Sequence, residues 1–166
     1  MNYIAQIIGI ISVILWIYSV QNKKQHKILF FQFLANLGYA IQYLLIKAYS
    51  ASAMNLSSSL RSLIFSIKRK HKKKISKLWL IFFLISIIIL GIITYDGLLS
   101  LLPTIITIFY AISSWVKDVK VMRIVFILAA FGWIYYNIQV HAYAAIIGNV
   151  FEIISGFISL IRFKKS

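Results

Sequence analysis

The sequence has 166 residues, of which 61% are hydrophobic and 13% charged. A soluble globular domain carries about a quarter charged residues, so this composition excludes most soluble folds and indicates a protein embedded in a lipid bilayer. The net charge is +15, from 18 Lys and Arg against 3 Asp and Glu, but the basic residues lie in short clusters between apolar runs. That pattern argues against nucleic-acid binding, which needs a folded basic face.

Sixteen of the 18 basic residues form four clusters that divide the chain into apolar intervals. The clusters are Lys23, Lys24 and Lys27, then Lys68 to Lys77, then Lys117, Lys120 and Arg123, and finally Arg162, Lys164 and Lys165. A membrane helix needs about 20 apolar residues. One span fits before the first cluster, and each of the intervals 28–67, 78–116 and 124–161 fits two spans with a polar break between them. The sequence therefore predicts seven transmembrane helices.

In chain order, we expect helices at about 4–21, 28–46 and 50–67, a fourth within 75–95, and three more at about 98–115, 121–138 and 142–161. This count places all four basic clusters on one side of the bilayer. Basic loops stay in the cytoplasm, so we expect the N-terminus outside and the C-terminus in the cytoplasm. The outer face would carry Lys47, Asp96 and His141.

The chain resembles itself at an offset of 94 residues, without gaps. The clearest matches are Gly38 with Gly132, Ala48 and Tyr49 with Ala142 and Tyr143, Ala51 with Ala145, and Asn55 with Asn149. We therefore expect an all-α integral membrane protein with two parallel three-helix repeats, residues 1–74 and 96–166. A linker helix within 75–95 returns the chain to the side where the second repeat must start. Parallel repeats of this kind occur in some transporters.

Three runs carry a resemblance to a known family. Residues 21–24 (QNKK), 36–39 (NLGY) and 48–55 (AYSASAMN) are similar to the YgjV family of bacterial inner-membrane proteins, and the likeness covers nearly the whole chain. It implies fold and location rather than an activity. The arrangement of three, one and three helices also resembles the SWEET sugar facilitators, the PQ-loop proteins and the PnuC-type vitamin transporters.

The SWEET resemblance implies a substrate pocket. Those transporters line a central pocket with an aromatic residue from the second helix and an Asn from the third helix of each repeat. Here Tyr39 precedes Asn55 by 16 residues, and Trp133 precedes Asn149 by the same spacing. The Pro-Gln pair of the first SWEET helix is absent, because Gly9 stands in one repeat and Pro103 with Thr104 in the other. The resemblance therefore does not imply a sugar as the substrate.

Polar residues on the same helices extend the candidate pocket to Asn36 and Asn137, which follow the helical spacing of Tyr39 and Trp133. A side-chain amide in hydrocarbon costs free energy unless it is hydrogen-bonded. The asparagines therefore mark either a solute pocket or hydrogen bonds that hold the helices together. Sequence alone does not separate these two interpretations.

Two charges lie inside the predicted spans. Arg61 and Glu152 differ in depth by about one helical turn, roughly 5 Å. A charge in mid-bilayer normally faces a partner or a water-filled cavity. We expect an intramembrane pair, which would act as an ion-sensitive gate, as a contact for a charged substrate or as a structural ion pair. Alternatively, Arg61 extends to the inner headgroups and leaves Glu152 unpaired.

Enzymatic chemistry finds no support, because we expect the three histidines in loops without a nearby acid, and the chain has no phosphate-binding Gly loop. We expect no catalytic, metal or cofactor site. The prediction is an alternating-access transporter or facilitator of a small polar solute, with bending at Gly9 and Pro103 in the first helix of each repeat. The alternative is a membrane protein that does not transport but binds a partner, interacts with lipid or acts in assembly.

Overall fold

The computed structural model describes residues 2–162, and these form seven α-helices. The helices are α1 (Tyr3–Val20), α2 (Gln25–Leu45), α3 (Tyr49–Lys70), α4 (Lys77–Ile93), α5 (Leu101–Trp115), α6 (Val119–Gln139) and α7 (Tyr143–Arg162), with a short 3-10 helix η1 (Leu98–Ser100) before α5. Lys164 and Lys165 of the fourth basic cluster lie outside the described residues. The predicted all-helical fold and each of the seven helices in this range are confirmed.

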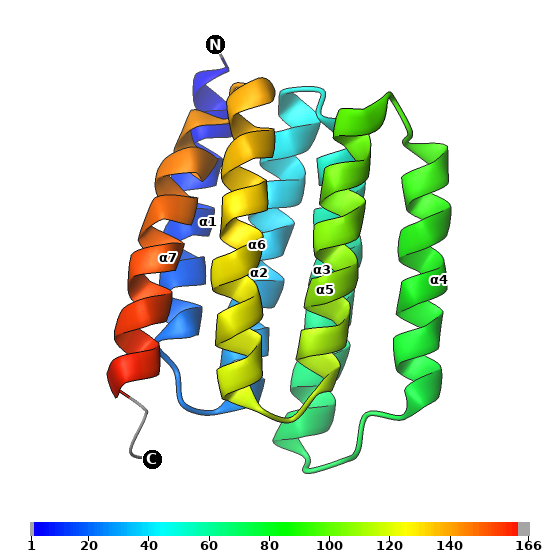
Figure 1. The fold of residues 1–166 in the computed structure, drawn as a ribbon, viewed down its shortest axis with the longest axis vertical. Helices are drawn as coiled ribbons and strands as arrows, with labels where there is room; N and C mark the ends of the chain where they lie inside the picture. The colour runs from blue at the N-terminus through cyan, green and yellow to red at the C-terminus, as the bar shows by residue number, and fades with distance from the viewer. Residues whose placement is uncertain (1, 163–166) are drawn as a thin grey trace.

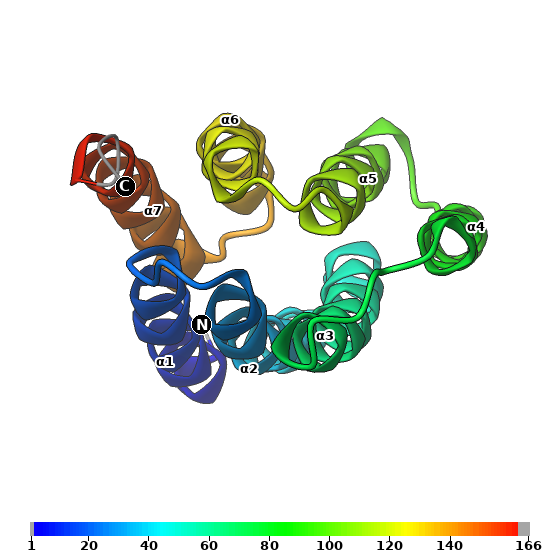
Figure 2. The same ribbon diagram turned by 90° about the horizontal axis from the view of Figure 1, so that it is seen from below.

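The helices stand side by side in two rows. Figure 2 shows α1, α2 and α3 in a first row and α7, α6 and α5 in a second row that faces it. At the two margins α1 packs against α7 and α3 packs against α5, whereas α4 lies outside the rows against α3 and α5. The space between the rows is therefore bordered by six helices.

The loops divide the charges between the two ends of the bundle. The basic end carries the loops 21–24, 71–76 and 116–118, and the opposite end carries the loops 46–48, 94–97 and 140–142 (Figure 1). Helix α1 begins at the opposite end and α7 finishes at the basic end. The loops of the opposite end carry Lys47, Asp96 and His141. The basic clusters of the described residues thus gather at one end.

Five segments are long and apolar enough to cross a membrane. They are α1, α2, η1 with α5, α6 and α7. Helix α4 is equally apolar but has 17 residues, which corresponds to about 26 Å. Large apolar side chains such as Ile4, Leu56, Ile92 and Phe131 are exposed on the outside of the bundle, as expected for side chains that face lipid.

Helix α3 is the least apolar of the seven, and part of its polar face is hydrogen-bonded to α2. Three serines spaced seven residues apart donate hydrogen bonds to α2 carbonyls that are also spaced seven apart. The pairs are Ser52 Oγ to Ala40 O (2.8 Å), Ser59 Oγ to Phe33 O (3.0 Å) and Ser66 Oγ to His26 O (2.7 Å). Helices α4 and α5 also pack against α3, so neighbouring helices rather than lipid cover its polar face.

The 94-residue offset of the sequence recurs in the geometry. Helices α2 and α6 begin and end 94 residues apart, and α3 and α7 begin 94 residues apart. Lys47 and His141 adopt left-handed backbone conformations, with φ of 62° and 56°, in the turns that follow α2 and α6. Gly38 and Gly132 lie where α2 meets α1 and where α6 meets α5. Helix bounds, left-handed turns and glycine contacts thus recur at a spacing of 94 residues.

Candidate functional site

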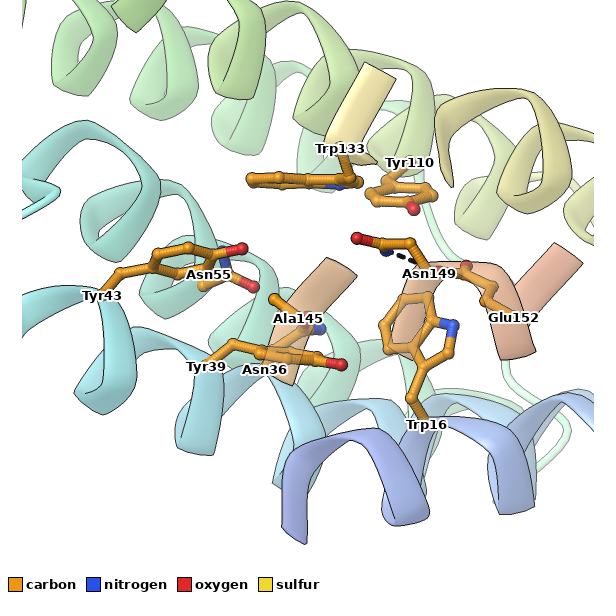
Figure 3. A pocket seen from close by; sticks show the side chains of 10 residues that line it. All are labelled: Trp16, Asn36, Tyr39, Tyr43, Asn55, Tyr110, Trp133, Ala145, Asn149 and Glu152. Atoms are coloured by element: carbon orange, nitrogen blue, oxygen red, sulfur yellow. Dashed lines mark hydrogen bonds between the residues drawn. The ribbon is translucent and has the colours of Figure 1, made fainter. Parts of the chain in front are cut away.

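A small cavity lies between the two rows, near the middle of the bundle (Figure 3). Its volume is about 20 Å³, which holds about one water molecule. Every helix except α4 contributes to its wall. The lining residues are Trp16, Asn36, Tyr39, Tyr43, Asn55, Tyr110, Trp133, Ala145, Asn149 and Glu152. The space that the described conformation leaves between these side chains is therefore small.

Three pairs of residues at the 94-residue offset line the central cavity. They are Trp16 with Tyr110, Tyr39 with Trp133, and Asn55 with Asn149. Each pair contributes one side chain from the first row and one from the second row. The central cavity thus lies where the two rows present equivalent positions to each other.

Five of the six residues predicted for the pocket line the central cavity. They are Tyr39, Trp133, Asn36, Asn55 and Asn149. The sixth, Asn137, does not line it but contacts two residues that do. The sequence places Tyr43 on the same helix face as Asn36 and Tyr39, as a packing or pocket residue, but it does not single out Trp16 or Tyr110. Trp16 and Tyr110 could have been found from the offset, because two aromatic residues 94 positions apart occupy the same depth in both halves.

A chain of buried hydrogen bonds connects α2, α6 and α7. The Tyr43 hydroxyl donates to Asn137 Oδ1 at 2.7 Å, and Asn137 Nδ2 donates to Asn149 Oδ1 at 2.9 Å. Asn149 Nδ2 in turn donates to Glu152 Oε2 at 3.3 Å. All the bonds point the same way, so the chain directs successive donors toward the Glu152 carboxylate.

Glu152 is 3% exposed, and its second oxygen, Oε1, has no hydrogen-bond partner. The indole nitrogen of Trp16 points toward this carboxylate (Figure 3). Among the ten residues that line the central cavity, Glu152 is the only Asp or Glu, and none is Lys, Arg or His. The central cavity therefore has an acidic, acceptor-rich side.

The predicted pairing of Arg61 with Glu152 is not formed as a salt bridge in this conformation. Arg61 is 2% exposed, and its Nε and Nη1 have no hydrogen-bond partner. Helix α3, which carries Arg61, packs on α2, α4 and α5, whereas α7, which carries Glu152, packs on α1 and α6. The two residues thus have similar depth but different neighbours, and lateral placement cannot be read from sequence spacing. Electrostatic coupling between them without contact stays a prediction.

Gly9 and Pro103, the predicted hinges, lie in continuous helices. A side chain at Gly9 would meet the Gln42 side chain at 2.6 Å, so the glycine permits close packing of α1 on α2. Pro103 is the third residue of α5, where its missing N–H removes no hydrogen bond from the helix. In this conformation Gly9 therefore serves helix packing and Pro103 the first turn of α5. That α1 and α5 bend at these residues stays a prediction.

Two aromatic clusters close the central cavity from its two ends. The basic-end cluster comprises Trp16, Tyr110 and Phe126, with ring centroids 5.3 to 5.9 Å apart. The opposite-end cluster comprises Tyr43, Trp133 and Tyr136, with ring centroids 5.8 to 6.3 Å apart. Each cluster draws residues from both rows, so movement of one row against the other would part its rings.

Two hollows indent the opposite end. The first, of about 520 Å³, lies among the loops 46–48 and 94–97 and reaches Tyr136. The second, of about 410 Å³, is lined by Asn2, Gln6, Ile46, Val140, His141 and Tyr143. Most residues of the second hollow lie 94 positions from a residue of the first, as His141 does from Lys47. Tyr136 lines the first hollow and Tyr43 lines the central cavity, so one aromatic layer separates the two spaces.

Hydrogen bonds between the rows hold the basic end together. Gln25 Nε2 of α2 donates to the carbonyl of Val116 at 2.7 Å, and Arg123 Nη2 of α6 donates to the carbonyl of Asn22 at 2.9 Å. The two accepting residues are 94 positions apart, so each row binds the equivalent loop of the other. Two further bonds cross between the rows, from Gln21 Nε2 to Ser155 Oγ (2.7 Å) and from Arg69 Nη2 to Trp115 O (2.7 Å).

Comparison with known proteins supports the resemblance seen in the sequence. Neither the curated proteins nor the solved structures contain a match to this chain. The family model Imp-YgjV, described as a bacterial inner membrane protein, matches residues 3–166. Because the match covers nearly all of the sequence and the helices are suited to a bilayer, this chain belongs to the Imp-YgjV family and is a multi-pass protein of the bacterial inner membrane.

Proposed function

We propose that this protein is an alternating-access transporter or facilitator of a small polar solute, with the central cavity as the solute site. The observation that carries the proposal is a small cavity between two rows of helices, lined by asparagines, a glutamate and aromatic residues that include three pairs of equivalent positions. Transporters built from repeats place their substrate near the bilayer midplane, at the interface between the repeats.

The proposed repeats are the first and second rows, with α4 as the linker. Three spans leave the chain on the side opposite to where it began, so a fourth crossing is needed before the second repeat can run parallel to the first. The recurrence of helix bounds, left-handed turns and hollows at the offset of 94 supports this arrangement. We also propose that the basic end faces the cytoplasm, because cytoplasmic loops of membrane proteins are rich in Lys and Arg.

In the proposed cycle, the described conformation is the occluded state. A volume of about 20 Å³ is too small for a solute larger than a few atoms, so the rows must part before a solute enters. Parting of the opposite-end cluster would join the first hollow to the central cavity. Rocking of one row against the other would then close that cluster and part the basic-end cluster.

Single cysteines in this cysteine-free chain test the proposal. Ala145→Cys and Asn55→Cys place a thiol in the wall of the central cavity, one in each row. In proteoliposomes of known orientation, an impermeant methanethiosulfonate reagent should modify both thiols whether it is added inside or outside. Leu56→Cys and Ile147→Cys, which point outward from the same helices, are the matched controls and should not react.

The alternative function predicts another outcome. A membrane protein that only binds a partner, interacts with lipid or acts in assembly has no need to expose the central cavity to both sides. Modification of Ala145→Cys and Asn55→Cys from one side alone, or from neither side, would contradict alternating access.

A further inference from the structure

We propose that the ligand of the central cavity is a small organic cation, bound by the Glu152 carboxylate and by the faces of the surrounding aromatic rings. This inference rests on the proposed function, because it names the class of solute that the same cavity would carry.

The first observation is a buried acid without a basic partner. Glu152 is 97% buried, its Oε1 has no hydrogen-bond partner, and none of the other lining residues is basic. A carboxylate in such an environment is costly unless an opposite charge compensates it. Arg61, the buried base in α3, forms no salt bridge with Glu152, and both residues lie in the described part of the chain. A cationic ligand would supply the missing charge.

The second observation is the aromatic wall. Five of the ten lining residues are aromatic: Trp16, Tyr39, Tyr43, Tyr110 and Trp133. Figure 3 shows Trp133 and Tyr110 on one side of the cavity, Tyr39 on the other, and Trp16 beside Glu152. The face of an aromatic ring attracts a cation, most strongly when both are removed from water. Carboxylate and rings together form a site that favours positive charge over neutral or negative groups.

The third observation concerns the amides. Asn55 Nδ2 donates to the carbonyl of Ala51 at 2.9 Å, and Asn149 Nδ2 donates to Glu152. The amide donors of both asparagines are thus directed to protein oxygens, whereas Glu152 Oε1 is left as an acceptor. An anionic solute needs several free donors, and these two asparagines direct theirs to protein oxygens instead. An ammonium group is a donor alone and suits an acceptor-rich site.

Thermal unfolding in detergent tests the inference with a matched pair of probes. Choline carries a quaternary ammonium, and 3,3-dimethylbutan-1-ol has the same shape without the charge; ethanolamine and ethylammonium provide smaller cations. At millimolar concentration, at least one cation should raise the melting temperature by about 3 °C, and the neutral analogue should not. If none of the three cations raises it more than the alcohol does, the inference is wrong.

Two variants locate the site. Glu152→Gln should abolish the cation-dependent shift, whereas Asp96→Asn, which removes an exposed acid at the opposite end, should retain it. A full shift in Glu152→Gln would overturn the assignment. If Glu152→Gln does not fold, protection of Ala145→Cys against the thiol reagent by the same cation, but not by the alcohol, decides the question in a chain that retains Glu152.

The two proposals fail in different ways. If Ala145→Cys is modified from both sides but no cation has an effect, the proposed transport function is retained and the cationic ligand is rejected. A cation effect with modification from one side alone would leave a cation-binding membrane protein that does not transport.

Discussion

The two ends of the bundle differ in what holds the rows together. At the basic end, side chains of α2 and α6 donate to loop carbonyls of the opposing row, and Gln21 and Arg69 add two more bonds. At the opposite end the middle of the bundle is indented by two hollows, and the layer beneath the first is made of packed rings. The bonds donated by the charged Arg69 and Arg123 contribute about 1.5–3 kcal/mol each, and those donated by the neutral Gln21 and Gln25 about 0.5–1.5 kcal/mol each. An aromatic pair contributes about 0.5–1.5 kcal/mol beyond its buried area.

The opposite end has its own hydrogen bonds between the rows. One of them, from the Tyr43 hydroxyl to Asn137 Oδ1 (2.7 Å), lies beside the opposite-end cluster, and two lie at the margins. Ser50 Oγ donates to the carbonyl of Ser100 at 2.8 Å, where α3 meets η1, and Gln6 Oε1 accepts from the backbone of Ala144 at 3.0 Å, where α1 meets α7. These margins can act as pivots while the centre opens. We therefore expect the opposite end to open first from the described conformation.

The largest expected effect concerns which end faces which side of the membrane. In right-side-out cells or vesicles, Asp96→Cys and His141→Cys should react with an impermeant thiol reagent added outside. Ser76→Cys, in a loop of the basic end, should react only after the membrane is permeabilised. Labelling of Ser76→Cys from outside would contradict the proposed orientation. The opposite end, which we expect to open first, would then face the cytoplasm.

The next largest effect is expected when the hydrogen bonds that join the rows at the basic end are removed. Changing Gln25→Leu and Arg123→Gln together removes the two equivalent bonds to the loop carbonyls of residues 116 and 22. Because 1.4 kcal/mol corresponds to a tenfold change in an equilibrium, we expect modification of Ala145→Cys from the basic side to become roughly 10 to 100 times faster. The same rate measured from the opposite side is the control and should not increase; an equal increase on both sides would indicate general loosening.

A smaller effect distinguishes the aromatic clusters. Tyr136→Leu thins the layer between the first hollow and the central cavity, so Ala145→Cys should be modified about 3 to 10 times faster from the opposite side. Phe126→Leu makes the matching change at the basic end, where the hydrogen bonds donated by the charged Arg69 and Arg123 still join the rows. It should therefore change the rate from the basic side by less, and a larger effect of Phe126→Leu would contradict the comparison.

The structure explains which parts of this picture the sequence could predict. Depth in a membrane helix increases regularly with residue number, so Asn55 and Asn149 were placed correctly at one level by counting. Lateral neighbours do not follow from counting, which is why Arg61 was paired with Glu152 although their helices pack on different partners. Trp16 was passed over because an aromatic residue in an apolar helix looks the same whether it faces lipid or a cavity.

The smallest expected effect separates bonds within a row from bonds between rows. Ser59→Ala removes one hydrogen bond from α3 to α2 and should lower the free energy of unfolding by about 1 kcal/mol. Both α2 and α3 belong to the first row, so the rates of Ala145→Cys modification from the two sides should stay unchanged. Melting temperature and modification rate are measured on the same variant, and a clear change in either rate would show that the rows do not move as units.

The most direct test of alternating access measures both ends at once. Spin labels on Lys23→Cys and Lys117→Cys span the rows at the basic end, and labels on Lys47→Cys and His141→Cys span them at the opposite end; each pair is 94 residues apart. Distances are measured by electron paramagnetic resonance in lipid, with and without choline. The account predicts two populations at each end, with a ligand-dependent shift that lengthens one distance while it shortens the other. A single unchanged distance at each end, or a change of the same sign at both, would contradict it.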